Sequence, residues 1–154
     1  EIRFEELTQL SIDLAKEASK DYEALIAGSF PPIETSFRPD LTPKDEALSQ
    51  FYSSIGSIME NEVDLIICET MSSIREGIQA ASTAKQYSDR VWLSWTTRGL
   101  NGEALPSGES LIDAVNAANE LNIECQLINC SAMDIVAAQI DTLTLAGKFG
   151  VFAN

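Results

Sequence analysis

The sequence predicts an α/β fold built on parallel strands, and three observations lead to that prediction. Five short runs are almost continuously apolar, as expected for strands buried on both faces of a parallel sheet. The segments between them carry helical periodicity and helix-start residues. Successive runs begin 24 to 39 residues apart, about the length of one βα unit. The runs are Ala24–Ala27, Val63–Cys68, Val91–Trp95, Cys125–Asn129 and Phe149–Ala153.

Two helices are predicted before the second apolar run. The first is amphipathic, because one helical stripe gathers its apolar side chains. Thr42 is the expected N-cap of the second, with Pro43 at the first helical position, and this helix should run to about Met59. The stripe of the first helix consists of Phe4, Leu7, Leu10, Leu14 and Ala18.

Three further helices are predicted from their start signals. Ser73 and Glu76 form a capping-box match that opens a helix to about Tyr87. Ser110 and Asp134 each precede an apolar periodicity of the helical kind. Helices and strands therefore alternate along the whole chain, which is typical of an α/β fold.

Two architectures fit this alternation. A doubly wound sheet of five strands would be complete at about this length, whereas a (β/α)8 or TIM barrel of about 250 residues would be only partly present. The chain begins on a helix with no preceding strand and stops at Asn154, without a helix after the fifth run. We therefore expect residues 1–154 to form part of a single TIM-barrel domain with five parallel strands.

Composition excludes several classes of function. The 24 acidic and 10 basic residues give a net charge of −14, which disfavours binding to nucleic acid and to anionic membranes. No apolar stretch approaches the length of a membrane span, and no targeting signal is visible. Three cysteines form no disulfide framework, so we expect reduced thiols in the cytoplasm. Without histidine, chemistry must use carboxylates, hydroxyls or thiolates.

Polar residues follow every predicted strand, where the catalytic groups of a βα barrel lie. Since the carboxyl ends of parallel strands meet at one end of the sheet, these residues should gather there. They are Gly28 and Ser29, Glu69 and Thr70, Thr96 to Arg98, Asn129 and Cys130, and finally Asn154.

Two of these residues could carry chemistry, and each also has a purely structural explanation. A thiolate at Cys130 could bind zinc, although a lone cysteine is more commonly a buried core residue. Cys68 and Cys125 lie inside predicted strands and are expected to be structural and not disulfide-bonded to Cys130. Glu69 could bind a substrate amino group or could complement the dipole of the following helix. Gly28 could allow either a tight turn or close approach of a ligand.

Five ordered segments resemble the homocysteine S-methyltransferase family. Each segment alone is a weak signal, but the five occur in order between residues 24 and 154. They are Ala27–Pro32 with Phe37–Asp40, Val63–Thr70, Trp92–Thr97 followed by Gly102 and Ser107–Glu109, Ile128–Cys130, and Val151–Asn154.

The resemblance implies a zinc-dependent enzyme that transfers a methyl group to the thiol of homocysteine and so makes methionine. In this family three cysteines hold the zinc, and Cys130 matches the first of them. Glu69 matches the glutamate that contacts the homocysteine amino group, and Asn129 is expected to support the zinc site or to contact substrate. Gly28, Ser29 and Thr96 are further expected substrate contacts.

Two motifs of the family are missing from the sequence, and their absence limits what the resemblance implies. The family's N-terminal Asp-Gly-Gly motif and its C-terminal Gly-Gly-Cys-Cys, which supplies two zinc ligands, have no match. The five strands then correspond to about strands 3 to 7 of eight, and the 154 residues alone should be inactive. The partners implied are homocysteine and a methyl donor whose identity the sequence does not fix. Open sheet edges would also favour homo-oligomers. A metal-free binding module and an unrelated doubly wound enzyme remain as alternatives.

Overall fold

A computed structural model describes residues 2–99 and 105–153. Its centre is a five-stranded sheet in the consecutive order β1-β2-β3-β4-β5, with every neighbouring pair parallel. The prediction of five parallel strands is confirmed. The strands are β1 Ala27–Phe30, β2 Leu65–Met71, β3 Val91–Trp95, β4 Cys125–Asn129 and β5 Phe149–Phe152.

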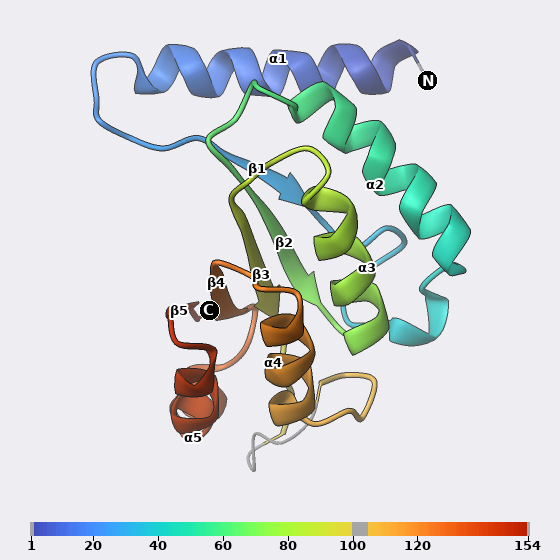
Figure 1. The fold of residues 1–154 in the computed structure, drawn as a ribbon, viewed down its shortest axis with the longest axis vertical. Coiled ribbons are helices and arrows are strands. Elements are labelled where there is room, and N and C mark those ends of the chain that lie inside the picture. The colour runs from blue at the N-terminus through green and yellow to red at the C-terminus, as the bar shows by residue number, and fades with distance from the viewer. Residues whose placement is uncertain (1, 100–104, 154) are drawn as a thin grey trace.

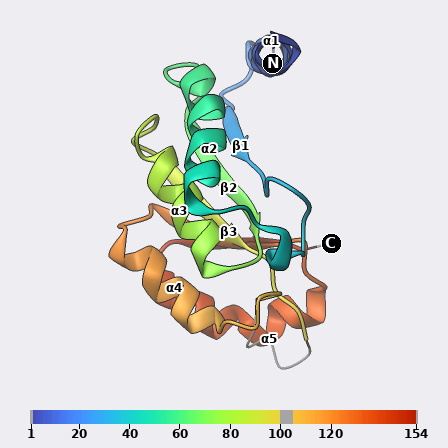
Figure 2. The same ribbon diagram turned by 90° about the vertical axis from the view of Figure 1, so that its right-hand side faces the viewer.

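In the described residues, one α-helix precedes the first strand, and four further α-helices and two short 3-10 helices lie between the strands. Helices α2, α3 and α4 lie along the same face of the sheet, while α1 crosses the top of the molecule against α2 (Figures 1 and 2). The α-helices are α1 Ile2–Ser19, α2 Asp45–Met59, α3 Ile74–Ala84, α4 Leu111–Glu120 and α5 Met133–Leu143, and the 3-10 helices are Pro39–Leu41 and Thr144–Ala146.

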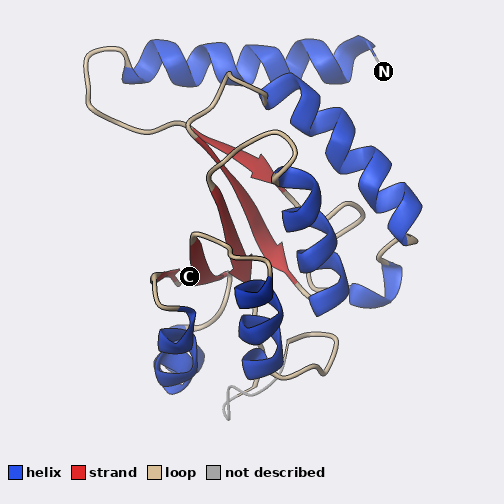
Figure 3. Cartoon of the chain, in the orientation of Figure 1, coloured by secondary structure: helices blue, strands red, loops and turns tan. Residues whose placement is uncertain are grey.

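This topology decides between the two predicted architectures. A doubly wound sheet reverses its strand order and carries helices on both faces. Here the order is consecutive and the helices gather outside one face (Figure 3), as in a segment of a TIM barrel. The doubly wound alternative is therefore wrong.

The hydrophobic core lies between the sheet and the helices. The ring of Phe30 in β1 stacks on Tyr52 in α2, with ring centroids 5.1 Å apart. Helix α3 approaches β3 so closely that a Cβ at Gly77 would lie 2.5 Å from the Trp95 ring, which explains the glycine. Ser29, Ile67 and Trp92 are in register on the opposite face, which forms the concave side of the partial barrel.

Some predicted boundaries were wrong. Strand β1 begins at Ala27, three residues later than predicted, because its hydrogen-bonded partner strand begins at Leu65. Leu25 is consequently 59% exposed despite its apolar character. Helix α2 begins at Asp45, and the Thr42 hydroxyl does not cap it but donates to the Glu76 carboxylate.

Three other helix starts show which of the predicted capping residues are correct. Ser73 and Ser110 do cap α3 and α4, accepting hydrogen bonds from the backbone N–H groups of Glu76 and Asp113. Asp134 lies inside the first turn of α5, whose N-cap position is Ala132.

Within the described residues, no helix is both long and apolar enough to cross a membrane.

An ion-pair cluster closes the amino end of strands β3 to β5. Glu124, just before β4, pairs with Arg90 before β3 and with Lys148 before β5, at 3.2 and 2.6 Å. Hydrogen bonds from Lys148 and Arg90 lower the pKa of Glu124 to about 2. Each of these charges therefore has an opposite charge beside it at this end.

Candidate functional site

The carboxyl end of β2 leaves regular strand geometry where the candidate residues lie. The register with β3 shifts between Cys68 and Met71, and Thr70 within this bulge has a φ of 59°. Cys130, directly after β4, has a φ of 50°. Left-handed backbone is uncommon for residues other than glycine, and such strain clusters at functional sites. Thr70 and Cys130 contact each other, with Thr70 Oγ1 3.5 Å from Cys130 Sγ.

A buried amide links the two irregular residues. Asn129 is fully buried at the end of β4, and its Oδ1 accepts hydrogen bonds from the Thr70 N–H at 3.1 Å and the Ser94 hydroxyl at 2.7 Å. Its Nδ2 donates to Thr70 Oγ1 at 2.8 Å and lies 3.3 Å from Cys130 Sγ. The side chain of Asn129 thus joins β2, β3 and the turn after β4.

The Cys130 thiol lies at the surface of this network. It is half-buried and free, and its Sγ is 3.5 Å from Thr70 Oγ1 as well as 3.3 Å from Asn129 Nδ2. Cys68 and Cys125 are also free, but both are buried, and burial raises the pKa of each thiol. Cys130 is therefore the cysteine among the three that is open to a ligand.

The backbone turn that carries Cys130 is held from β3. The Thr96 hydroxyl donates to the Cys130 carbonyl at 3.2 Å, and the Thr97 N–H donates to Ser131 Oγ at 2.9 Å. Ser131 in turn donates to the Asn129 carbonyl at 3.0 Å. Thr96 is fully buried, so its position suits support of the turn better than direct contact with substrate.

Glu69 lies next to this network on the concave side of the sheet. Its Oε1 accepts a 2.5 Å hydrogen bond from the Ser29 hydroxyl of β1. No ion pair joins Glu69 to a lysine or arginine in the part of the chain that the structure describes. The half-buried carboxylate therefore has an oxygen available for a cationic group of a ligand.

Gly28 is placed differently from the other candidates. It lies inside β1, not after it, and is buried on the helix-covered face, where a Cβ would be 2.6 Å from Met59 Sδ and 3.3 Å from Val63. The predicted position at the strand exit was wrong because β1 begins later than its apolar run. Its packing against Met59 accounts for the glycine. Asn154 lies outside the described residues.

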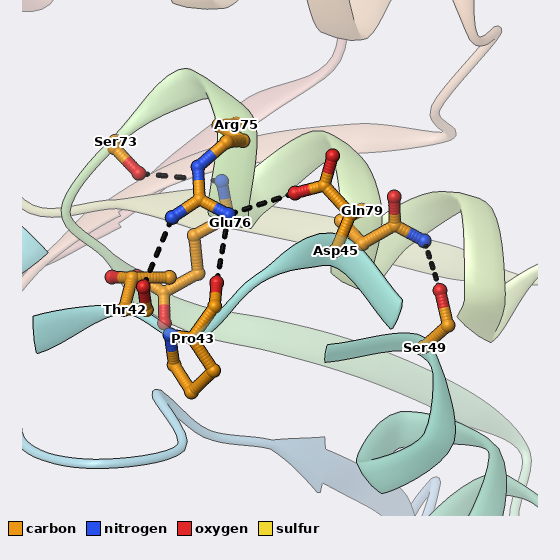
Figure 4. A network of polar contacts seen from close by, with 8 residues as sticks. All are labelled: Thr42, Pro43, Asp45, Ser49, Ser73, Arg75, Glu76 and Gln79. Atoms are coloured by element: carbon orange, nitrogen blue, oxygen red, sulfur yellow. Dashed lines mark hydrogen bonds and ion pairs between the residues drawn. The ribbon is translucent and has the colours of Figure 1, made fainter. Parts of the chain in front are cut away.

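The loop from β1 to α2 is fastened to the start of α3 (Figure 4). Arg75 donates to the carbonyls of Thr42 and Pro43 and to the Asp45 carboxylate, at 3.1, 2.8 and 2.7 Å. Beside it the Glu76 carboxyl is buried, and this burial raises its pKa. The Phe37 N–H also donates to Ser72 Oγ at 3.2 Å, so this loop is held against the carboxyl end of β2.

Cys130, with Thr70 and Asn129 beside it, fits one ligand position of a zinc site. A half-exposed thiol beside two hydrogen-bond donors matches a thiolate ligand, whereas zinc needs at least three protein ligands. The described residues contain no group of three Cys, Asp or Glu side chains that could hold a metal. Any complete zinc site must therefore include ligands from outside these residues.

Comparison with known proteins identifies the family. The sequence model of the family described as "Homocysteine S-methyltransferase" matches residues 1–154 of this chain. The chain belongs to this family. Among curated proteins, none matches it in sequence.

Solved structures support the same fold. The homocysteine methyltransferase MmuM from Escherichia coli in its apo form aligns with a TM-score of 0.76 and 22% identity over 99% of the chain. Its metallated form aligns with a TM-score of 0.77 and 24% identity over 97%. The chain spans 68% and 65% of those two proteins, so it covers about two thirds of a homocysteine methyltransferase of that size.

Two residues that complete the network, Ser94 and Thr70, were given no role in the site by the sequence. Ser94 sits in the middle of an apolar strand, and only the register of β3 with its neighbours brings it beside Asn129. Thr70 follows Glu69, and the bulge in β2 turns it toward Cys130. Both lie within segments that resemble the family, but nothing in those segments indicates that their side chains meet.

Proposed function

We propose that this chain is the central part of a zinc-dependent homocysteine S-methyltransferase, covering about strands 3 to 7 of its barrel. The family match and the consecutive parallel sheet support this assignment. Apolar side chains exposed on α1 and β5 fit it too, since the remaining barrel strands and helices would cover them. These include Leu7, Leu14, Val151 and Phe152.

The observation that carries the proposal is the placement of Cys130. Its half-exposed thiol lies at the carboxyl end of β4 and is held by Asn129 and Thr70, while Glu69 precedes Thr70 in the chain. A free thiol and a carboxylate that forms no ion pair with any described residue thus emerge at the same end of the sheet. The carboxyl end is where TIM-barrel enzymes react.

Each residue then has a defined task. Cys130 supplies one zinc ligand, and two more come from outside these residues. Bound zinc would stabilise the homocysteine sulfur as a thiolate at neutral pH. Glu69 binds the substrate ammonium group, with Ser29 orienting the carboxylate, and Thr96 and Asn129 fix the turn that carries Cys130.

The reaction transfers one methyl group between two partners. The homocysteine sulfur loses its proton and forms a bond to the donor's methyl carbon, while the bond from that carbon to the donor breaks and its electrons leave with the donor. The products are methionine and demethylated donor. We expect this chemistry in the cytoplasm, where thiols stay reduced.

Methionine formation tests the proposal against a metal-free binding module. The complete chain that contains these residues should form methionine from homocysteine and a sulfonium or quaternary ammonium donor. Cys130→Ser should abolish the reaction, whereas Cys125→Ser, a change at the other end of the same strand, should retain it. A Cys130→Ser chain with the parental rate would contradict the proposal.

A further inference from the structure

The orientation of the Asn129 amide is fixed by its neighbours. Its Oδ1 faces the backbone N–H of Thr70, and a backbone N–H can only donate. The Ser94 hydroxyl donates to the same oxygen at 2.7 Å. Exchange of the amide oxygen and nitrogen would put the NH2 group against the Thr70 N–H, which cannot accept, so a single orientation satisfies the site.

Counting hydrogens then assigns the contacts at Cys130. The Nδ2 group of Asn129 has two hydrogens, one directed to Thr70 Oγ1 at 2.8 Å and the other to Cys130 Sγ at 3.3 Å. Thr70 Oγ1 lies 3.5 Å from Sγ, and a Cys130 thiolate has no hydrogen to donate, so the Thr70 hydroxyl is the donor to a thiolate at this position. The sulfur therefore faces two donors, one from β2 and one from β4.

Burial makes this network a fixed part of the fold. Ser94 and Asn129 are fully buried and Thr70 is 5% exposed, so water cannot readily replace the contacts among them. Ser94 donates to Asn129, and in the described part of the chain no hydrogen bond joins it directly to Cys130. A buried hydroxyl in the middle of an apolar strand is costly unless it is satisfied, and here its partner is the amide that contacts the sulfur.

We propose that Thr70 and Ser94 are positioning residues for the metal ligand Cys130. The Ser94 hydroxyl anchors the Asn129 amide oxygen, and the amide and the Thr70 hydroxyl together hold the sulfur so that its uncovered side faces the metal. This inference rests on the proposed function, because it takes Cys130 as a ligand. Groups that orient a metal ligand typically change metal affinity by about 10- to 100-fold when removed.

The test is the zinc affinity of the complete chain, measured by competition with a chelator. Thr70→Val removes the hydroxyl at nearly constant shape, and Ser94→Ala removes the anchor of the amide. Each should weaken zinc binding by about 10- to 100-fold. Thr70→Ser keeps the hydroxyl and should restore affinity to within about threefold of the parent, on the same scale.

A matched control separates positioning from general stability. Thr83 is also buried, but its hydroxyl donates to the Gln79 carbonyl within α3, away from the site. Thr83→Val should leave zinc affinity unchanged. In the cobalt-substituted protein, the sulfur-to-cobalt charge-transfer band should shift in Thr70→Val and Ser94→Ala but not in Thr83→Val. This band arises only from folded molecules that hold the metal, so a loss of folded protein would not shift it.

The outcomes distinguish this inference from the proposed function. Parental zinc affinity in Thr70→Val and Ser94→Ala, with metal lost in Cys130→Ser, would overturn the positioning roles and leave the proposed function intact. Equal weakening by Thr83→Val, or no rescue by Thr70→Ser, would also overturn them. Metal fully retained in Cys130→Ser would instead overturn the proposed function.

Discussion

The two ends of the sheet differ in whether their acidic side chain is paired with basic ones. At the amino end, Glu124 has two cations, Arg90 and Lys148, within ion-pair distance. At the carboxyl end, Glu69 accepts a hydrogen bond from neutral Ser29 and forms no ion pair with a described residue. A carboxylate left without a cation in the folded chain is available to a ligand, whereas a compensated one is not.

Strand β4 shows the same contrast with two cysteines. Cys125 at its start is 4% exposed, and burial raises the pKa of its thiol. Cys130, one residue past its end, is half-buried and adopts a left-handed backbone beside two hydrogen-bond donors. The cysteine at the amino end is packed in the core and the one at the carboxyl end is accessible, and the carboxyl end is where TIM barrels place their catalytic residues.

The largest predicted effect that tests the difference between the two ends is the effect of replacing Glu69 on the KM for homocysteine. In the complete chain, Glu69→Ala should raise the KM for homocysteine roughly ten- to a hundred-fold, because one charged hydrogen bond to the ammonium group, about 1.5 to 3 kcal/mol, is lost. Steady-state kinetics with varied homocysteine would measure it. An unchanged KM would mean that Glu69 does not contact the substrate.

A smaller effect, on stability and not on activity, is expected from Glu124. Its pKa of about 2 lies below the ordinary 4.5, so the stability it contributes is present above pH 4.5 and is lost as the pH falls toward 2. Glu124→Gln should lower the free energy of unfolding at pH 7 by about 0.5 to 1 kcal/mol, since the side chains are partly exposed. The difference should shrink between pH 4.5 and 2.

Denaturant unfolding at several pH values, together with the KM for homocysteine, would check this prediction. The KM should match the parent, because Glu124 lies at the end of the sheet remote from Glu69. A Glu124→Gln variant with normal stability but impaired homocysteine binding would break the distinction between the two ends.

Much of the fold could be predicted from the sequence because its signals are local. Strands β3 and β4 coincide with their apolar runs, and Ser73 and Ser110 cap helices as their spacing indicates. Strand β1 could not be located by apolarity, because pairing with Leu65 in β2 sets where it begins. The loop that contains Thr42 likewise depends on contacts with Arg75 and Glu76 in α3.

The site was only partly predictable for the same reason. Cys130 and Glu69 stand out because a reactive side chain occurs where an apolar run ends. Ser94 and Thr70 belong to the site through sheet register and a β-bulge, which bring together residues from three strands. Gly28 was expected after its strand because of the same misplaced boundary, whereas it lies within β1.

The most direct test of the central claim is the zinc content of four purified proteins under reducing conditions. They are the complete chain, its Cys130→Ser and Cys125→Ser variants, and the 154 residues alone. We expect about one zinc per molecule in the complete chain and in Cys125→Ser, because zinc sites need at least three ligands and Cys130 is one of them. Cys130→Ser and the 154 residues alone should hold little or none, and the latter should form no methionine. Full zinc occupancy in Cys130→Ser would contradict the account.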